Sequence, residues 1–111
     1  MKWVEIISLR CPTSVDIRVV DGLLKEVSES DSPTDSPNHL VEIRAYSNFA
    51  VETDLSIHIH WESEKESQCK TPLGLRFSSV LRNLGLLNHS VWVETTAREI
   101  NHRIRHSADV E

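Results

Sequence analysis

The residues best suited to chemistry are two histidines, His58 and His60, which stand two positions apart in the run TDLSIHIHWE (53–62). Apolar and polar residues alternate through this run, so we expect a strand with both imidazoles on its polar face. Two imidazoles so placed could share a metal ion, with Glu5 or Glu62 as the carboxylate ligand. The same spacing suits hydrogen-bonded histidines at a subunit interface. We prefer this second interpretation, so neither a metal nor a cofactor is expected.

Two carboxylates offer a second kind of chemistry. Glu5 and Glu94 fall in segments that we expect to pair as neighbouring strands, close to His58 and His60. A carboxylate beside a histidine favours the protonated imidazole, and such a pair could act as a general base. Ion-pair networks across dimers are a commoner use of these groups. The four residues are therefore candidates for catalysis, and whether the protein is an enzyme stays open.

Six predicted elements must position these groups. The strands are expected at 2–10, 39–48, 53–62 and 90–96, and the helices at 14–28 and from Thr71-Pro72 to Gly85. Apolar residues at helical spacing predict the first helix. Thr71 as N-cap, Pro72 as the first residue and Gly85 as the stop predict the second. The polar stretch 28–38 is expected to be a loop.

The order strand, helix, strand, strand, helix, strand favours a ferredoxin-like α+β fold. The right-handed crossover rule then gives a four-stranded antiparallel sheet of order 4-1-3-2, with both helices on one face. A chain of 111 residues is long enough for one domain of this kind, which we expect over residues 1–96. Residues 97–111 are expected to form a C-terminal tail that could contact a second copy.

The sheet should have one face that its own helices do not cover. The residues predicted to face the helices are Val4, Ile6, Val41, Ile43, Ile57, Ile59, Val91 and Val93. The residues predicted for the open face are Trp3, Glu5, Ile7, Glu42, Arg44, Tyr46, Ser56, His58, His60, Trp92 and Glu94. A face that mixes large aromatic and ionisable side chains is usually covered by another surface. Because a two-fold contact uses the same patch of both copies, we expect a homodimer. Trp3 and Trp92 could instead stack on a planar ligand.

These elements resemble the dimeric α+β barrel superfamily, which includes antibiotic-biosynthesis-type monooxygenases and stress-responsive barrel proteins. The resemblance covers residues 2–96, through the element order, the strand ending IHIHWES and the passage LRNLGLLNHSVWVE. It implies a dimer whose sheets face each other, often with a pocket between sheet and helices that could take a small organic ligand. Some members oxidise polycyclic substrates without a cofactor, and others bind haem through a histidine of the second helix. No histidine occurs between Pro72 and Gly85, so we do not expect the haem binding of those members in this chain.

Composition argues against several classes of function. The net charge of −5 argues against a general nucleic-acid binder, and no apolar run is long enough for a membrane span. Two cysteines and no recognisable signal peptide favour a reduced, cytoplasmic protein. We therefore expect a cytoplasmic small-molecule-binding or assembly protein. The alternatives are a cofactor-independent monooxygenase-like enzyme and a metal-dependent activity at His58 and His60.

Overall fold

The computed structural model describes residues 1–30, 38–64, 69–96 and 98. Its elements are β1 (Lys2–Arg10), α1 (Ile17–Ser30), β2 (His39–Ser47), β3 (Asp54–Glu62), α2 (Pro72–Leu81), the 3₁₀ turn η1 (Arg82–Leu84) and β4 (Leu86–Val93). Apart from Arg98, the predicted tail at 97–111 lies outside the described residues. Within the part that is described, no helix is long and apolar enough to cross a membrane.

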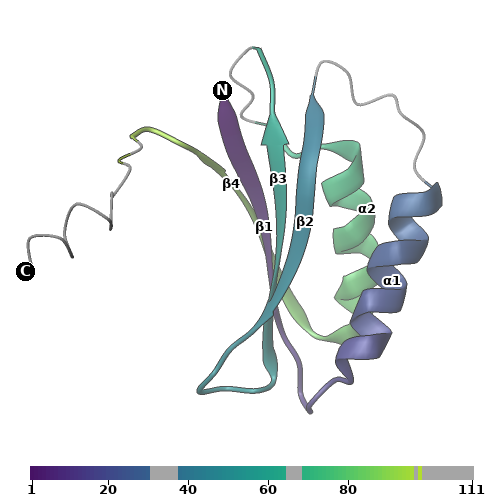
Figure 1. The fold of residues 1–111 in the computed structure, drawn as a ribbon. Helices are drawn as coiled ribbons and strands as arrows, with labels where there is room; N and C mark the ends of the chain where they lie inside the picture. Colours follow the sequence, from purple (N-terminus) through teal and green to yellow (C-terminus); the bar gives the residue numbers. More distant parts are fainter. Residues whose placement is uncertain (31–37, 65–68, 97, 99–111) are drawn as a thin grey trace, which may run out of the picture.

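The four strands form one antiparallel sheet of order β2-β3-β1-β4, which is the predicted order read from the other edge. Both helices lie on the same face of this sheet, and no helix or strand of the described residues lies on the opposite face (Figure 1). The predicted ferredoxin-like arrangement of an α+β domain is therefore confirmed. The two central strands, β1 and β3, are the ones that any site on the sheet must use.

Helix α2 begins as its sequence predicts. Thr71 caps the helix, because its side-chain oxygen accepts a hydrogen bond of 3.0 Å from the backbone N–H of Gly74. The helix ends at Leu81 and continues as the η1 turn before Gly85. Gly85 has an extended backbone, and a Cβ there would collide with the carbonyl oxygen of Arg10. The glycine is thus needed for close approach to β1.

The core lies between the sheet and the helices. Its buried apolar residues are Trp3, Ile7, Leu9, Cys11, Val20, Val27, Leu55, Ile57, Ile59, Trp61, Leu73, Phe77 and Leu81. Strand β3 contributes its apolar face as predicted. Helix α1 contributes Val20 and Val27, which lie on its buried side. Strand β2 is less covered, since Val41, predicted to face the helices, is 58% exposed beside a register shift between Leu40 and Glu42. The shift is a bulge, and it breaks the strict alternation on which the prediction for Val41 relied.

The predicted facing of β1 was wrong. Glu5 pairs with Ile59 and Ile7 pairs with Ile57, so these side chains share the helix-covered face. Val4 and Ile6 lie instead on the open face and are half-buried. Both faces of β1 carry apolar residues, so alternation gave no unique answer. The side chains of Trp3, Ile7 and Leu9 bury more apolar surface beneath the helices than those of Val4 and Ile6 would. The one acid on that face, Glu5, is accommodated by hydrogen bonds.

Candidate functional site

The open face carries side chains in rows that cross the four strands, since paired residues of antiparallel strands point the same way. The first row, here called the polar row, contains Tyr46, Ser56, Ser8 and Asn88. The second row contains Arg44, His58, Ile6 and Ser90. The third contains Glu42, His60, Val4 and Trp92. The predicted placement of the β2 and β3 residues and of Trp92 on this face is confirmed.

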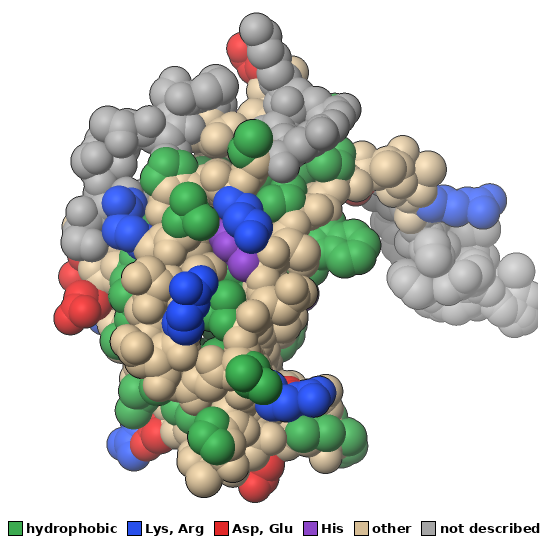
Figure 2. Space-filling view, turned by 180° about the vertical axis from the view of Figure 1, so that it is seen from behind, with side chains coloured by type: hydrophobic (Ala, Val, Ile, Leu, Met, Phe, Trp, Pro, Cys, Tyr) green, Lys and Arg blue, Asp and Glu red, His purple; other side chains and the backbone are tan. Residues whose placement is uncertain are grey.

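This face is hollowed and only partly polar. Figure 2 shows the open face in profile, and there the molecular outline is concave on the side away from the helices. Trp92 is 59% exposed and Tyr46 is 45% exposed, although both are large aromatic residues. Val4 and Ile6 are half-buried beside them. The face thus leaves apolar surface unpartnered in the described chain.

His58 lies at the centre of the open face and is held by its neighbours. Its Nε2 is 2.8 Å from the Oγ of Ser56, and its ring centroid is 4.7 Å from that of Tyr46. The ring of His60 is 6.2 Å away. Partial burial lowers the pKa of His58, and the neighbouring His60 lowers the pKa further. His58 is therefore biased toward the neutral imidazole, which can accept a hydrogen bond or bind a metal.

Trp3 does not lie on the open face, so its predicted position was wrong. It is 3% exposed and packs beneath the helices, where its ring stacks on Trp61 with centroids 5.7 Å apart. Its indole N–H donates to the hydroxyl of Ser63 at 3.0 Å. Trp61 is buried in the core as expected. Trp3 cannot pair with Trp92 around a ligand on the open face.

Glu5 also lies on the helix-covered face, where it is fully buried. Its Oε1 accepts hydrogen bonds from the indole N–H of Trp61, at 2.8 Å, and from the hydroxyl of Thr71. Its Oε2 accepts from the backbone N–H of Thr71 at 3.0 Å and lies 2.8 Å from Nε2 of His89. These donors replace the water that a buried carboxylate loses. Glu5 therefore ties β1 to β3, to β4 and to the start of α2.

His89 has a buried side chain, although the expected strand at 90–96 left this residue in the preceding loop. Strand β4 begins at Leu86 and not at Ser90, so His89 lies within the strand opposite Ile7. Its side chain is 4% exposed, and its Nδ1 lies 3.1 Å from the Oγ of Ser78 on α2. A strand predicted from Leu86 would have placed Leu87, His89 and Val91 on one face. That alternation is the signal that could have located His89.

Ser78, His89 and Glu5 are residue types that serve as a catalytic triad in acyl transfer. Their surroundings do not support that use here. Ser78 is 3% exposed and Glu5 is fully buried. Neither residue, nor His89, lines the two surface hollows described below. The three groups form a sealed hydrogen-bond network, which suits an anchor between the sheet and α2.

Of the candidate metal ligands, Glu5 is separated by the sheet from the two histidines, whereas Glu62 alternates onto their face at the end of β3. His58 and His60 lie on the open face, and Glu5 lies on the other face. Among the described residues, no three of the types His, Cys, Asp and Glu are grouped closely enough to hold an ion. Glu94 is exposed beyond the end of β4, where its backbone N–H donates to the carbonyl of Lys2 at 3.1 Å. The predicted proximity of Glu5 to His58 and His60 on one face was wrong.

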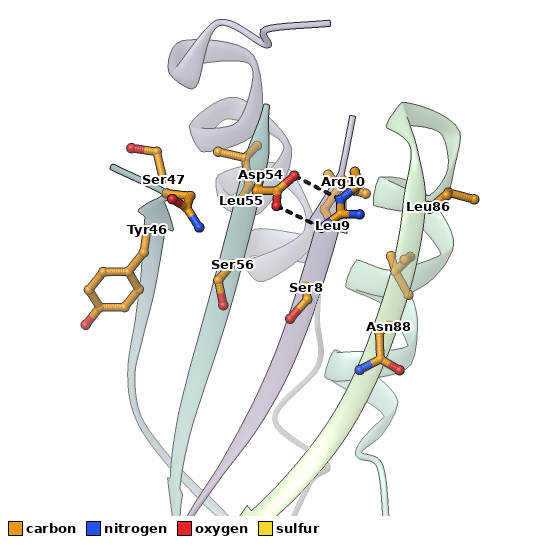
Figure 3. Close-up of a pocket in the computed structure, with 12 residues that line it drawn as sticks. Ser8, Leu9, Arg10, Tyr46, Ser47, Asp54, Leu55, Ser56, Leu86 and Asn88 are labelled. Atoms are coloured by element: carbon orange, nitrogen blue, oxygen red, sulfur yellow. Dashed lines mark hydrogen bonds and ion pairs between the residues drawn. The ribbon is translucent and has the colours of Figure 1, made fainter. Parts of the chain in front are cut away.

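Two hollows lie at opposite ends of the open face. One has a volume of about 270 Å³ and is lined by Lys2, Trp3, Val4, His60, Trp92, Val93 and Glu94. The other, of about 550 Å³, contains the polar row and the ion pair of Arg10 with Asp54 (Figure 3). The second lies within the usual size range of small-molecule sites. Ser56 was predicted for the open face, but Ser8 and Asn88 were not singled out from the sequence, because isolated polar residues in strands give no motif.

The sequence was also compared with known proteins. No family model, no curated protein and no solved structure matches it. The function must accordingly be argued from the geometry of the open face and of the two hollows.

Proposed function

We propose that the protein is a homodimeric binding or assembly protein whose two subunits join through the open face of the sheet. One observation carries this proposal. Both helices cover the same face of the sheet (Figure 1), and side chains of the other face form a patch that we call the central patch. The central patch consists of Val4, Ile6, His58, His60 and Trp92. Apolar surface of this kind, bordered by polar residues, is typical of interfaces.

The charges around the central patch favour contact with a second copy. Arg44 and Glu42 form an ion pair of 3.0 Å on β2, beside the two histidines. This pair leaves little net charge for a partner to match. The lowered pKa of His58 keeps the middle of the patch neutral above its titration range. A two-fold contact requires only that a surface be self-complementary, and a patch of Val, Ile, Trp and His side chains bordered by an ion pair meets that requirement.

Binding is better supported than catalysis. The residues named as candidate acids and bases are distributed over both faces of the sheet, with Glu5 on one side and His58 and His60 on the other. General acid–base chemistry needs such groups within hydrogen-bond reach of one substrate. The hydrogen-bonded acid and base of the structure, Glu5 and His89, are buried. A dimer with a ligand site on or beside the paired sheets therefore fits the geometry best.

Sedimentation velocity over a range of concentrations tests this proposal. We expect a concentration-dependent dimer for the wild-type chain. Ile6→Arg places a charge in the central patch and should give a monomer. Leu75→Arg is the matched control, because Leu75 is 52% exposed on α2, in the helix layer, and should stay dimeric. A wild-type monomer at every concentration, or equal effects of the two variants, would overturn the proposal.

A further inference from the structure

The polar row brings hydrogen-bonding side chains from neighbouring strands together at one end of the open face, where the hydroxyl of Ser56 already lies 2.8 Å from Nε2 of His58. In register, Ser8 lies between Ser56 on β3 and Asn88 on β4. These three side chains stand side by side along the floor of the larger hollow (Figure 3). Within the described residues, the hydroxyl of Ser8 and the amide of Asn88 make no side-chain hydrogen bond. They are available to a ligand as both donors and acceptors.

Charge at this hollow is balanced. Arg10 donates to both carboxylate oxygens of Asp54, with N–O distances of 3.2 and 3.3 Å. The pair stands next to the polar row on the same face, at the end of β1 (Figure 3). Because each charge has its partner, the hollow has no net charge to attract an anion or a cation. A neutral ligand rich in hydroxyl groups matches this lining.

The dimensions of the hollow restrict the size of ligand that it can bind. Adjacent strands lie about 4.8 Å apart, so a row across four strands extends over roughly 14 Å. Alternate hydroxyl groups around a pyranose ring are separated by a distance similar to one strand spacing. Tyr46 bounds the row on β2 and Leu86 bounds the hollow on β4, and both offer apolar surface for the C–H faces of a sugar. The row is long enough for more than one ring.

We propose that this hollow is a binding site for a neutral saccharide of disaccharide length. Ser8, Ser56 and Asn88 bind its hydroxyl groups, and the Arg10–Asp54 pair binds one end. The inference goes beyond the proposed function, since the subunits join through the central patch and the sugar occupies the polar row beside it. Each contact is a neutral hydrogen bond of modest net strength, so the expected affinity is in the millimolar range.

An NMR titration of the isotope-labelled full chain tests the site. Amide ¹H–¹⁵N spectra are recorded with maltose, cellobiose and lactose as probes. We expect saturable shifts at Ser8, Ser56 and Asn88 with at least one of them. The double variant Ser8→Ala/Asn88→Ala should weaken binding by about tenfold, which corresponds to the loss of two ordinary hydrogen bonds. Ser79→Ala, the same change at an exposed serine of α2, should bind like the wild type.

Three results would overturn the inference. The first is the absence of saturable shifts with all three disaccharides. The second is equal binding by the wild type and the double variant. The third is an equal response of the same residues to phosphate or glutamate, since a charged ligand contradicts a neutral site. Diffusion measurements on the same samples separate this site from the dimer. If the chain is a dimer but binds no disaccharide, only the saccharide site is contradicted. If the chain is a monomer that binds a disaccharide, only the proposed dimer is contradicted.

Discussion

Glu5 of β1 and His89 of β4 meet beneath helix α2, with Oε2 and Nε2 2.8 Å apart and both side chains almost completely buried. Two further residues, Trp61 and Thr71, complete the hydrogen bonds of the carboxylate. The hydrogen bonds of Glu5 to Thr71 and of His89 to Ser78 join this part of the sheet to α2. They also remove from the open face the acid that the sequence interpretation had placed there.

Glu5→Gln should destabilise the protein, because the amide replaces one of two acceptor oxygens by a donor. That donor would face the indole N–H of Trp61 and hydroxyl of Thr71, or else the backbone N–H of Thr71. We expect the free energy of unfolding in urea to fall by about 1–3 kcal/mol. Glu94→Gln is the control, since Glu94 is exposed and should change stability by less than about 0.5 kcal/mol. Equal stability of the wild type and Glu5→Gln would contradict the anchoring role.

Gly74→Ala and Gly22→Ala should have opposite effects. A Cβ at Gly74 would collide with the carboxylate of Glu5, whereas a Cβ at Gly22 meets nothing within 4 Å. Overpacking at Gly74 should cost about 1–3 kcal/mol. In the interior of α1, alanine at 22 should add about 0.5–1 kcal/mol, because glycine loses more backbone entropy. Thermal or urea unfolding measures both changes, and a stabilised Gly74→Ala variant would show that α2 does not press on Glu5.

His58 should make the protein less stable in acid. Its pKa in the folded chain is lowered from 6.5, so the unfolded chain binds the proton more readily between the lowered value and 6.5. Stability from this group is complete above about pH 6.5 and is lost as the pH falls through that window. Urea midpoints at about pH 8 and about pH 5 measure the loss. His58→Gln should show a smaller loss than the wild type, and an unchanged pH dependence would refute the assignment.

The sequence was informative where one face of an element was clearly apolar. The alternation of Leu55, Ile57, Ile59 and Trp61 in β3 predicted both the strand and its buried face. Strand β1 gave no such contrast, because apolar residues occupy both of its faces. Its facing is decided by the partners of Glu5, which come from positions 61, 71 and 89 and are brought together by the fold. Long-range hydrogen bonds of this kind leave no local pattern.

The polar row was hidden for a related reason. Ser8, Ser56 and Asn88 are ordinary residues within their own strands and become a set through strand register. His58 and His60, in contrast, formed a recognisable local pattern, and their placement on the open face was correct. The local alternation therefore located the central patch in part. The hollow beside it required the pairing of all four strands.

The most direct test of the account is an isotope-filtered NOE experiment on a mixture of labelled and unlabelled chains, which detects contacts between subunits alone. We predict intersubunit NOEs from the methyl groups of Val4 and Ile6 to residues of the open face, including the Trp92 ring. These signals should disappear in Ile6→Arg. Intersubunit NOEs that arise instead from helix residues such as Val19 or Leu75, or the absence of any intersubunit NOE at concentrations where the chain is a dimer, would contradict a dimer joined through the open face.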